Sequence, residues 1–162
     1  MLSQAELLEK IRPLWKRDGA IYRKNKNVFA RPAKPGEIVY THTADGLETA
    51  NTAAEGDFIV RNQTGAGEAY IVPANKFSHK YARLRPAGEG WDEYTPLGHI
   101  IAVELSPERL TELGLPDTFE FMAAWGQAMI AKAGDYLGGP VTETEVYRIA
   151  HKEFGETYVP AG

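Results

Sequence analysis

The ionisable and nucleophilic residues of this chain give little support for catalysis. There are four histidines and no cysteine, which excludes thiolate nucleophiles, cysteine-bound zinc and disulfides. No two histidines have the HxH, HxxxH or HExxH spacing that places two imidazoles on one metal ion. Ser78 directly precedes His79, and neighbouring helical side chains point about 100° apart, so the two do not form a nucleophile–base pair. The sequence therefore predicts no catalytic residue, no metal site and no cofactor.

The glycine-rich segment Gly65-Ala66-Gly67 does not fit a phosphate cradle. No Lys-Ser or Lys-Thr follows it, as a P-loop requires. It also leads into an expected strand, whereas phosphate cradles lead into the N-terminus of a helix. We expect a hairpin loop there.

Aromatic residues suggest a binding function more strongly. Eight tyrosines are present, and they fit either core rings with the hydroxyl at the rim or the wall of a shallow groove. Trp91 and Tyr94 lie in a polar segment and have no periodic reason to be buried, which favours contact with a partner. The candidate ligand- or partner-binding residues are Arg61, Tyr70, His79, Tyr81, Arg83, Trp91, Tyr94, Tyr147 and Tyr158.

Several of these tyrosines belong to a stretch that occurs twice. Residues 56–81 recur as residues 134–158, and each copy contains a Tyr, Phe, Tyr series spaced 7 and 4 residues apart. Each copy also begins with Gly-Asp, and we expect Asp57 and Asp135 to form turns. The matches in register predict an internal duplication.

Each copy predicts a strand, a hairpin loop, a second strand and a short helix. In the first copy, residues 58–60 and 70–72 have the aromatic and β-branched composition of strands, and Pro73 ends the second strand. Phe77 and Tyr81 then follow a spacing of four, which predicts one helical turn.

The motif at the start of each copy resembles the PGDYL motif of a small bacterial and phage domain family. It is present as residues 55–59 (EGDFI) and residues 133–137 (AGDYL), and residues 68–70 and 77–81 are similar to the family as well. The first copy, from about Val28 to Tyr81, fits best. The resemblance implies a fold and carries no established activity.

The rest of the chain supplies an N-terminal helix and further strands. Ser3 and Glu6 form a capping box, and because Pro13 removes a backbone hydrogen bond we expect the helix to span about Gln4 to Arg12. The other expected elements are strands over residues 20–22, 28–30, 37–43, 47–53 and 98–105, a turn at Ala44-Asp45-Gly46, a helix from Ser106 to Gly114, and a hairpin over residues 118–130.

The predicted fold class is α+β, with two β-rich units related by internal duplication and an N-terminal helix. Each unit is expected to be a small meander or half-barrel plus a short helix. Residues 1–84 form the first unit with its helix, residues 85–97 a Pro- and Gly-containing linker, and residues 98–162 the second unit. One fused domain is the alternative.

Charge is distributed unevenly along the chain. Residues 1–35 carry nine Lys and Arg against three acidic residues, although the whole chain has a net charge of −4. The basic segment can contact nucleic acid, dock on an acidic body or face solvent. The residues that a nucleic acid would contact are Lys10, Arg12, Lys16, Arg17, Arg23, Lys24 and Lys26.

The favoured function is a non-catalytic binding module of a soluble bacterial or phage protein. It would hold a protein, peptide or small molecule at the cleft between the units or at the aromatic linker. No apolar run approaches the ~20 residues of a membrane span, and no signal-peptide core is present, so we expect a cytoplasmic protein without a membrane partner. One alternative is an enzyme acting on a nucleotide or other phosphorylated small molecule, with Arg61, His79, Arg83 and Asp57 brought together by the fold. A nucleic-acid-associated protein is the second alternative.

Overall fold

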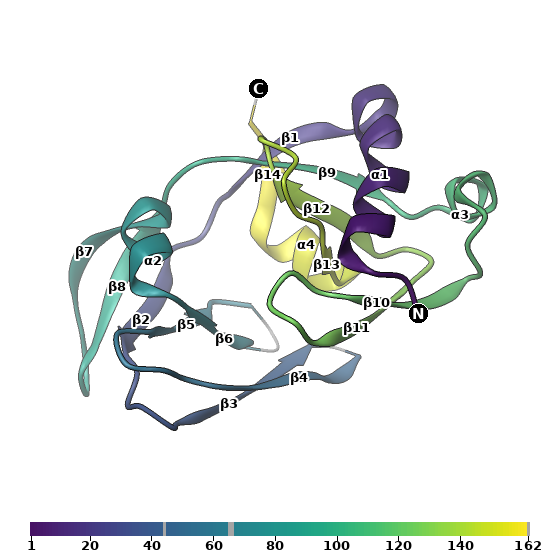
Figure 1. Cartoon of the computed structure of the whole chain (residues 1–162). Coiled ribbons are helices and arrows are strands. Elements are labelled where there is room, and N and C mark those ends of the chain that lie inside the picture. The colour runs from purple at the N-terminus through teal and green to yellow at the C-terminus, as the bar shows by residue number, and fades with distance from the viewer. Residues whose placement is uncertain (44, 65–66, 162) are drawn as a thin grey trace. The chain divides into compact units, whose positions relative to one another are not determined.

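The computed structural model describes residues 1–43, 45–64 and 67–161 (Figure 1). The expected turn at residues 44–46 and the expected loop at residues 65–67 lie partly outside these residues. Within them the fold is α+β, as predicted, with two five-stranded sheets, two two-stranded sheets and four helices.

The chain divides into two compact units, one of which interrupts the other in the sequence. We call residues 1–23 together with 99–162 the split unit, and residues 24–98 the inserted unit. This division differs from the one expected at residues 84 and 98. Residues 85–97, expected to be a linker, lie largely in the paired strands β7 (Tyr81–Gly88) and β8 (Trp91–Pro96).

Among the described residues, the split unit contains three helices and seven strands, of which one, β1, extends by a single residue into the inserted unit. They are α1 (Gln4–Asp18), β1 (Ala20–Lys24, whose last residue belongs to the inserted unit), β9 (Ile100–Glu104), α3 (Pro107–Leu113), β10 (Thr118–Met122), β11 (Ala128–Lys132), β12 (Tyr136–Pro140), β13 (Tyr147–Ile149), α4 (His151–Thr157) and β14 (Tyr158–Pro160). Its large sheet has the order β13-β12-β9-β1-β14, and β10 pairs with β11.

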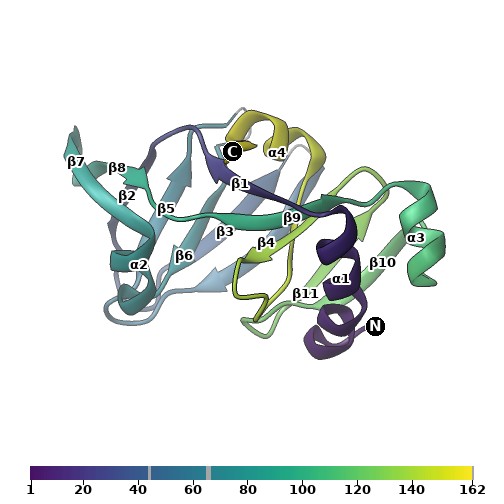
Figure 2. The same ribbon diagram turned by 90° about the horizontal axis from the view of Figure 1, so that it is seen from above.

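The inserted unit has one helix, α2 (Ala74–Lys80), among its described residues. Its remaining strands are β2 (Val28–Pro32), β3 (Ile38–Thr43), β4 (Gly46–Thr52), β5 (Phe58–Asn62) and β6 (Ala69–Val72). The large sheet has the order β6-β5-β2-β8-β7, and β3 pairs with β4 (Figure 2).

Helix α1 is longer than the sequence predicted. The capping box is confirmed, because Ser3 Oγ accepts a bond from the Glu6 N–H at 3.0 Å and Glu6 Oε1 accepts one from the Ser3 N–H at 2.9 Å. The expected end at Arg12 is wrong: Pro13 lies inside the helix, which continues to Asp18.

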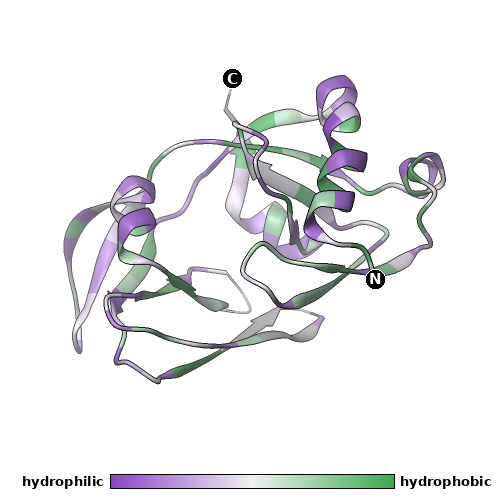
Figure 3. Ribbon diagram, in the orientation of Figure 1, coloured by the Kyte–Doolittle hydropathy of each residue, from purple (hydrophilic) through white to green (hydrophobic). Residues whose placement is uncertain are grey.

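Tertiary packing explains why α1 tolerates this proline. A proline inside a helix costs about 3 kcal/mol, whereas burying one large apolar side chain contributes about 1.5–3 kcal/mol. Leu14 and Trp15, beyond the proline, are both buried, and Trp15 Nε1 donates to the Leu137 carbonyl at 3.0 Å. Helix α1 accordingly carries a hydrophobic and a hydrophilic side (Figure 3). The gain from docking the last turn outweighs the cost of the proline.

The two large sheets correspond strand by strand. Tyr136 on β12 pairs with Glu104 on β9, and Phe58 on β5 pairs with Pro32 on β2 at the matching places. The central strand is β9 in the split unit and β2 in the inserted unit. On one side, β9 pairs with β12 and β2 pairs with β5, and each central strand has a second neighbour on its other side. That second neighbour is β8 in the inserted unit and β1 in the split unit, so the split unit takes this strand from the N-terminal segment. The duplication itself stays a prediction.

The repeated Gly-Asp pair forms the expected turns. Asp57 Oδ2 accepts a bond from the Ala54 N–H at 2.9 Å, and Asp135 Oδ2 accepts one from the Lys132 N–H at 2.9 Å. In each turn the preceding glycine has positive φ, 86° at Gly56 and 92° at Gly134. The helix expected after residue 106 is also confirmed, since Ser106 caps the N-terminus of α3.

Candidate functional site

Seven of the nine predicted site residues lie in the inserted unit, and Tyr147 and Tyr158 lie in the split unit.

The pairing register assigns the side chains of the inserted unit's large sheet to two faces. Arg61 on β5 pairs with Phe29 on β2, and Phe29 pairs with Glu93 on β8. Directly paired residues share a face, and so do residues two apart on one strand. Arg31 and Trp91 therefore lie on the same side as Arg61. We call this side, with Phe29, Arg31, Arg61, Trp91 and Glu93, the Trp91 face.

The opposite side packs against helix α2, and we call it the helix face. Its core contains Val28, Ala30, Val60 and Val72 of the sheet together with Phe77 of α2. Tyr70, Tyr81 and Tyr94 belong to this side, as their contacts with that core show.

Two arginines stack on the indole of Trp91. The guanidinium carbon of Arg61 lies 4.4 Å from the ring centroid, and that of Arg31 lies 5.1 Å from it. A guanidinium on an aromatic face keeps its planar fork of N–H donors available for a carboxylate or phosphate. The Trp91 face therefore presents a flat aromatic ring next to oriented cationic donors.

The charges of the Trp91 face are not all balanced. Arg31 forms an ion pair with Glu37, and the hydrogen bonds from Arg31 and from the Lys34 N–H lower the pKa of Glu37 to about 2. Arg85 forms an ion pair with Glu93 at 2.9 Å. By contrast, Arg61 is exposed and has no carboxylate partner among the side chains that the structure describes.

Glu93 is held by two donors. Asn27 Nδ2 donates to Glu93 Oε2 at 2.9 Å, and Arg85 Nε donates to Oε1 at 2.9 Å. These two hydrogen bonds lower the pKa of Glu93. The carboxylate of Glu93 is therefore satisfied within the unit. Among the described side chains of this face, Arg61 is the exposed charge without a counter-ion.

On the helix face, Phe77 is the centre of a ring cluster. Its ring stacks on Phe58 with centroids 4.1 Å apart, and Tyr94 meets it edge-on at 4.8 Å. Tyr81 lies 5.2 Å from the same ring. Tyr81 was expected in the same helical turn as Phe77, but helix α2 ends at Lys80 and Tyr81 is the first residue of β7. These contacts make the rings of Tyr81 and Tyr94 part of the core on the helix face.

Lys24 joins two of the tyrosines through their hydroxyls. Its Nζ donates to Tyr70 Oη at 2.9 Å and to Tyr81 Oη at 3.1 Å, and the two hydroxyl oxygens lie 2.9 Å apart. Tyr70 also donates to Asn62 Oδ1 at 3.2 Å. The sequence predicted Tyr70 and Tyr81 as binding residues, whereas Lys24 was predicted only as part of the basic N-terminal segment. No local pattern in the sequence connects residue 24 with residues 70 and 81.

The two phenols of this cluster are not equivalent. Burial raises the pKa of Tyr70 well above its ordinary value. Burial also opposes ionisation of Tyr81, but the charge of Lys24 and the hydrogen bonds from Tyr70 and Lys24 outweigh it, so the pKa of Tyr81 is lowered. Tyr81 is therefore expected to lose its proton at a lower pH than Tyr70.

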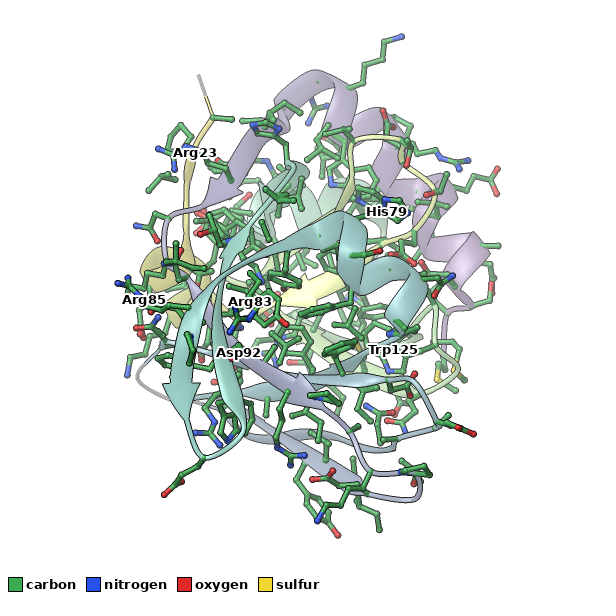
Figure 4. All side chains as sticks on the ribbon, turned by 90° about the vertical axis from the view of Figure 1, so that its left-hand side faces the viewer. Arg23, His79, Arg83, Arg85, Asp92 and Trp125 are labelled. Atoms are coloured by element: carbon green, nitrogen blue, oxygen red, sulfur yellow. The ribbon has the colours of Figure 1, made fainter. Side chains whose placement is uncertain are left out.

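The four residues suggested for an enzyme do not converge. Arg83 pairs with Tyr94, so it lies on the helix face, opposite to Arg61. It forms an ion pair with Asp92 at 3.1 Å on the β7–β8 hairpin (Figure 4). His79 is exposed on α2, and Asp57 caps a turn.

The split unit repeats the ring cluster around the phenylalanine of its own short helix. Phe154 of α4 stacks on Tyr136 with centroids 3.6 Å apart, meets Tyr22 edge-on at 4.9 Å, and lies 5.1 Å from Tyr158. Tyr147 occupies the place on β13 that Tyr70 has on β6, since the two pair with Gly138 and Val60. The next residue of β13, Arg148, forms a buried ion pair with Asp135, with 2.9 Å between Arg148 Nε and Asp135 Oδ2.

Most of the basic N-terminal side chains contact acceptors of their own unit. The acceptors are the Leu113 carbonyl for Lys10, the Glu143 carbonyl for Arg12, Asp18 and Glu112 for Arg17, Tyr70 and Tyr81 for Lys24, and the Gln63 carbonyl for Lys26. Lys16 and Arg23 are exposed. The nucleic-acid alternative stays a prediction, and most of the side chains that it needs already have acceptors.

Within the described part of the chain, no three His, Asp or Glu residues are grouped so that they could hold a metal ion. None of the helices described is both long and apolar enough to cross a membrane.

Comparison of the chain with protein-family models, with curated proteins and with solved structures finds no match. The resemblance to the PGDYL-motif family therefore stays a prediction.

Proposed function

We propose that the protein is a non-catalytic binding module whose site is the Trp91 face of the inserted unit. The ligand carries an oxyanion, a carboxylate or phosphate, next to a flat or apolar group. The observation that carries the proposal is the position of Arg61, whose exposed guanidinium has no carboxylate partner among the described side chains and lies 4.4 Å from the centre of the Trp91 ring.

Three features of this face support that ligand chemistry. The other arginines of the face, Arg31 and Arg85, already have carboxylate partners, so an incoming anion gains most from Arg61. Stacking on Trp91 restricts the guanidinium before binding, which lowers the entropy cost of forming a bidentate contact. Phe29, half-buried and directly paired with Arg61, supplies apolar surface next to the charge.

The test is a titration of the full chain with small carboxylates, phosphates and acidic peptides, monitored by NMR at the Trp91 indole N–H and the Arg61 Nε–H. Arg61→Gln is expected to weaken binding about 10- to 100-fold, since a hydrogen bond to a charged group contributes about 1.5–3 kcal/mol. Arg61→Lys keeps the charge but loses the planar fork, and is expected to bind with intermediate affinity.

Arg83→Gln is the matched control, because Arg83 is an exposed arginine on the opposite face of the same sheet. It should leave affinity unchanged. An equal loss in Arg61→Gln and Arg83→Gln, or the absence of shifts at Trp91 and Arg61 with every anion, contradicts the proposal.

A further inference from the structure

The cluster of Lys24, Tyr70 and Tyr81 lies on the helix face and plays no part in the site proposed above. Its geometry is that of a shared proton site, with three polar atoms all within 3.1 Å of one another.

The hydrogen-bond partners of the cluster distinguish its two phenol oxygens, because Asn62 Oδ1 accepts a bond from Tyr70 and so favours the protonated form of Tyr70. Lys24 donates to both hydroxyls, and Tyr70 can give its single proton either to Asn62 or to Tyr81. When Tyr70 donates to Tyr81, the oxygen of Tyr81 receives two donors, one of them an ammonium. An oxygen in that position is best satisfied without its own proton.

We propose that Lys24, Tyr70 and Tyr81 form a proton-accepting site in which Tyr81 becomes the phenolate and Lys24 is its counter-ion. Tyr70 remains a neutral phenol that donates to Tyr81. Because Tyr70 is half-buried and Tyr81 is buried, the proton is exchanged with solvent through Tyr70. The released proton leaves as hydronium or on a buffer base, so no other reactant is required.

The surrounding charges agree with this assignment. Tyr81 faces Lys24 at the end of β1, Tyr70 on β6 and, at longer range, Lys80 of α2. Tyr94 of β8 joins the same core, and burial raises its pKa, as it does that of Tyr70. On β8, Asp92 is held by Arg83. The cations near Tyr81 thus stabilise its anion, whereas the neighbouring phenols resist ionisation.

The test is a pH titration of the full chain with isotope-labelled tyrosine, in which NMR follows each of the eight phenols separately. Tyr81 is expected to titrate before Tyr70 and Tyr94. Lys24→Gln should move the Tyr81 midpoint to higher pH, Lys24→Arg should move it less because the charge remains, and Tyr70→Phe should raise it because one donor is lost.

Tyr158→Phe is the control, because it removes the tyrosine that has the place of Tyr81 in the split unit, and it should leave the Tyr81 midpoint unchanged. Lys24→Arg keeps the charge, so the test survives if Lys24→Gln fails to fold. The proposal is overturned if Tyr70 titrates first, or if neither Lys24 variant shifts the midpoint of Tyr81.

Discussion

Tyr22 and Tyr94 occupy the same place in two different sheets. Tyr22 on β1 pairs with Ile100, the first residue of β9, and Tyr94 on β8 pairs with Val28, the first residue of β2. Each ring meets the phenylalanine of a short helix edge-on, at 4.9 Å and 81° for Tyr22 and at 4.8 Å and 76° for Tyr94. In the split unit, β1 from the beginning of the chain thus has the position in the sheet that β8 has in the inserted unit.

This relationship predicts unequal folding of fragments. Residues 24–98 contain every strand of their large sheet, so we expect them to fold when expressed alone. Residues 99–162 lack β1 and the buried side of α1, so they should be unfolded alone and should fold when a peptide of residues 1–23 is added. Amide dispersion in NMR spectra measures both. Folding of residues 99–162 without the peptide would contradict the strand assignment.

The buried ion pair of the split unit predicts a large effect of one aspartate and a small effect of its counterpart. Asp135 is 1% exposed and pairs with Arg148, whereas Asp57 forms the same turn but Ile71 stands where Arg148 would be. Asp135→Asn removes the carboxylate charge that faces the buried Arg148 at 2.9 Å and should lower the free energy of unfolding by about 3–5 kcal/mol. Asp57→Asn should change it by about 0.5 kcal/mol.

Urea denaturation of both variants measures these free energies. The double variant Asp135→Asn, Arg148→Met should recover part of the loss, because it also removes the buried charge of Arg148. If Asp57→Asn costs as much as Asp135→Asn, the effect belongs to the turn and not to the ion pair.

The ion pair between Arg31 and Glu37 predicts an acid-sensitive contribution to stability. The pKa of Glu37 falls from its ordinary value of 4.5 to about 2 in the folded chain. A carboxyl with a lowered pKa stabilises the folded state above its unfolded pKa, and that contribution is lost as the pH falls towards the folded pKa. Stability should therefore decrease between about pH 5 and pH 2.

The measurement is the urea midpoint of the parent chain and of Glu37→Gln across that pH range. Glu37→Gln should show a flatter pH dependence, whereas Glu55→Gln, at an exposed position, should follow the parent. Identical curves for the parent and Glu37→Gln would argue against the pair.

Substitution of two glycines by alanine is expected to change the free energy of unfolding in opposite directions. A Cβ added at Gly139 would lie 2.2 Å from the Glu145 carbonyl oxygen and 2.9 Å from the Trp15 ring, so Gly139→Ala should cost about 1–3 kcal/mol. At Gly155, inside α4, a Cβ meets nothing within 4 Å. Gly155→Ala should stabilise by about 0.5–1 kcal/mol, because alanine has fewer unfolded conformations. Thermal and chemical denaturation of the pair test both signs, and a stabilising Gly139→Ala would contradict the close packing of β12.

Local patterns in the sequence were enough to predict most individual elements. The capping box at Ser3, the Gly-Asp turns and the short helix around Phe77 follow from hydrogen bonds and apolar spacing within a few residues. The helix end at Arg12 was predicted wrongly, because the burial of Trp15 against a strand more than a hundred residues away offsets the cost of Pro13. Packing at that separation leaves no local signal.

The sequence alone determined the α+β class, the kinds of elements and the repeated aromatic spacing, since these depend on side chains close together in the chain. Only the tertiary structure decided that β1 serves where β8 does in the other unit, that Arg61 and Arg83 lie on opposite faces, and that Lys24 reaches Tyr70 and Tyr81. The reason is that strand partners and register are chosen by the burial of whole faces, and a shift of one residue would turn every side chain to the other side.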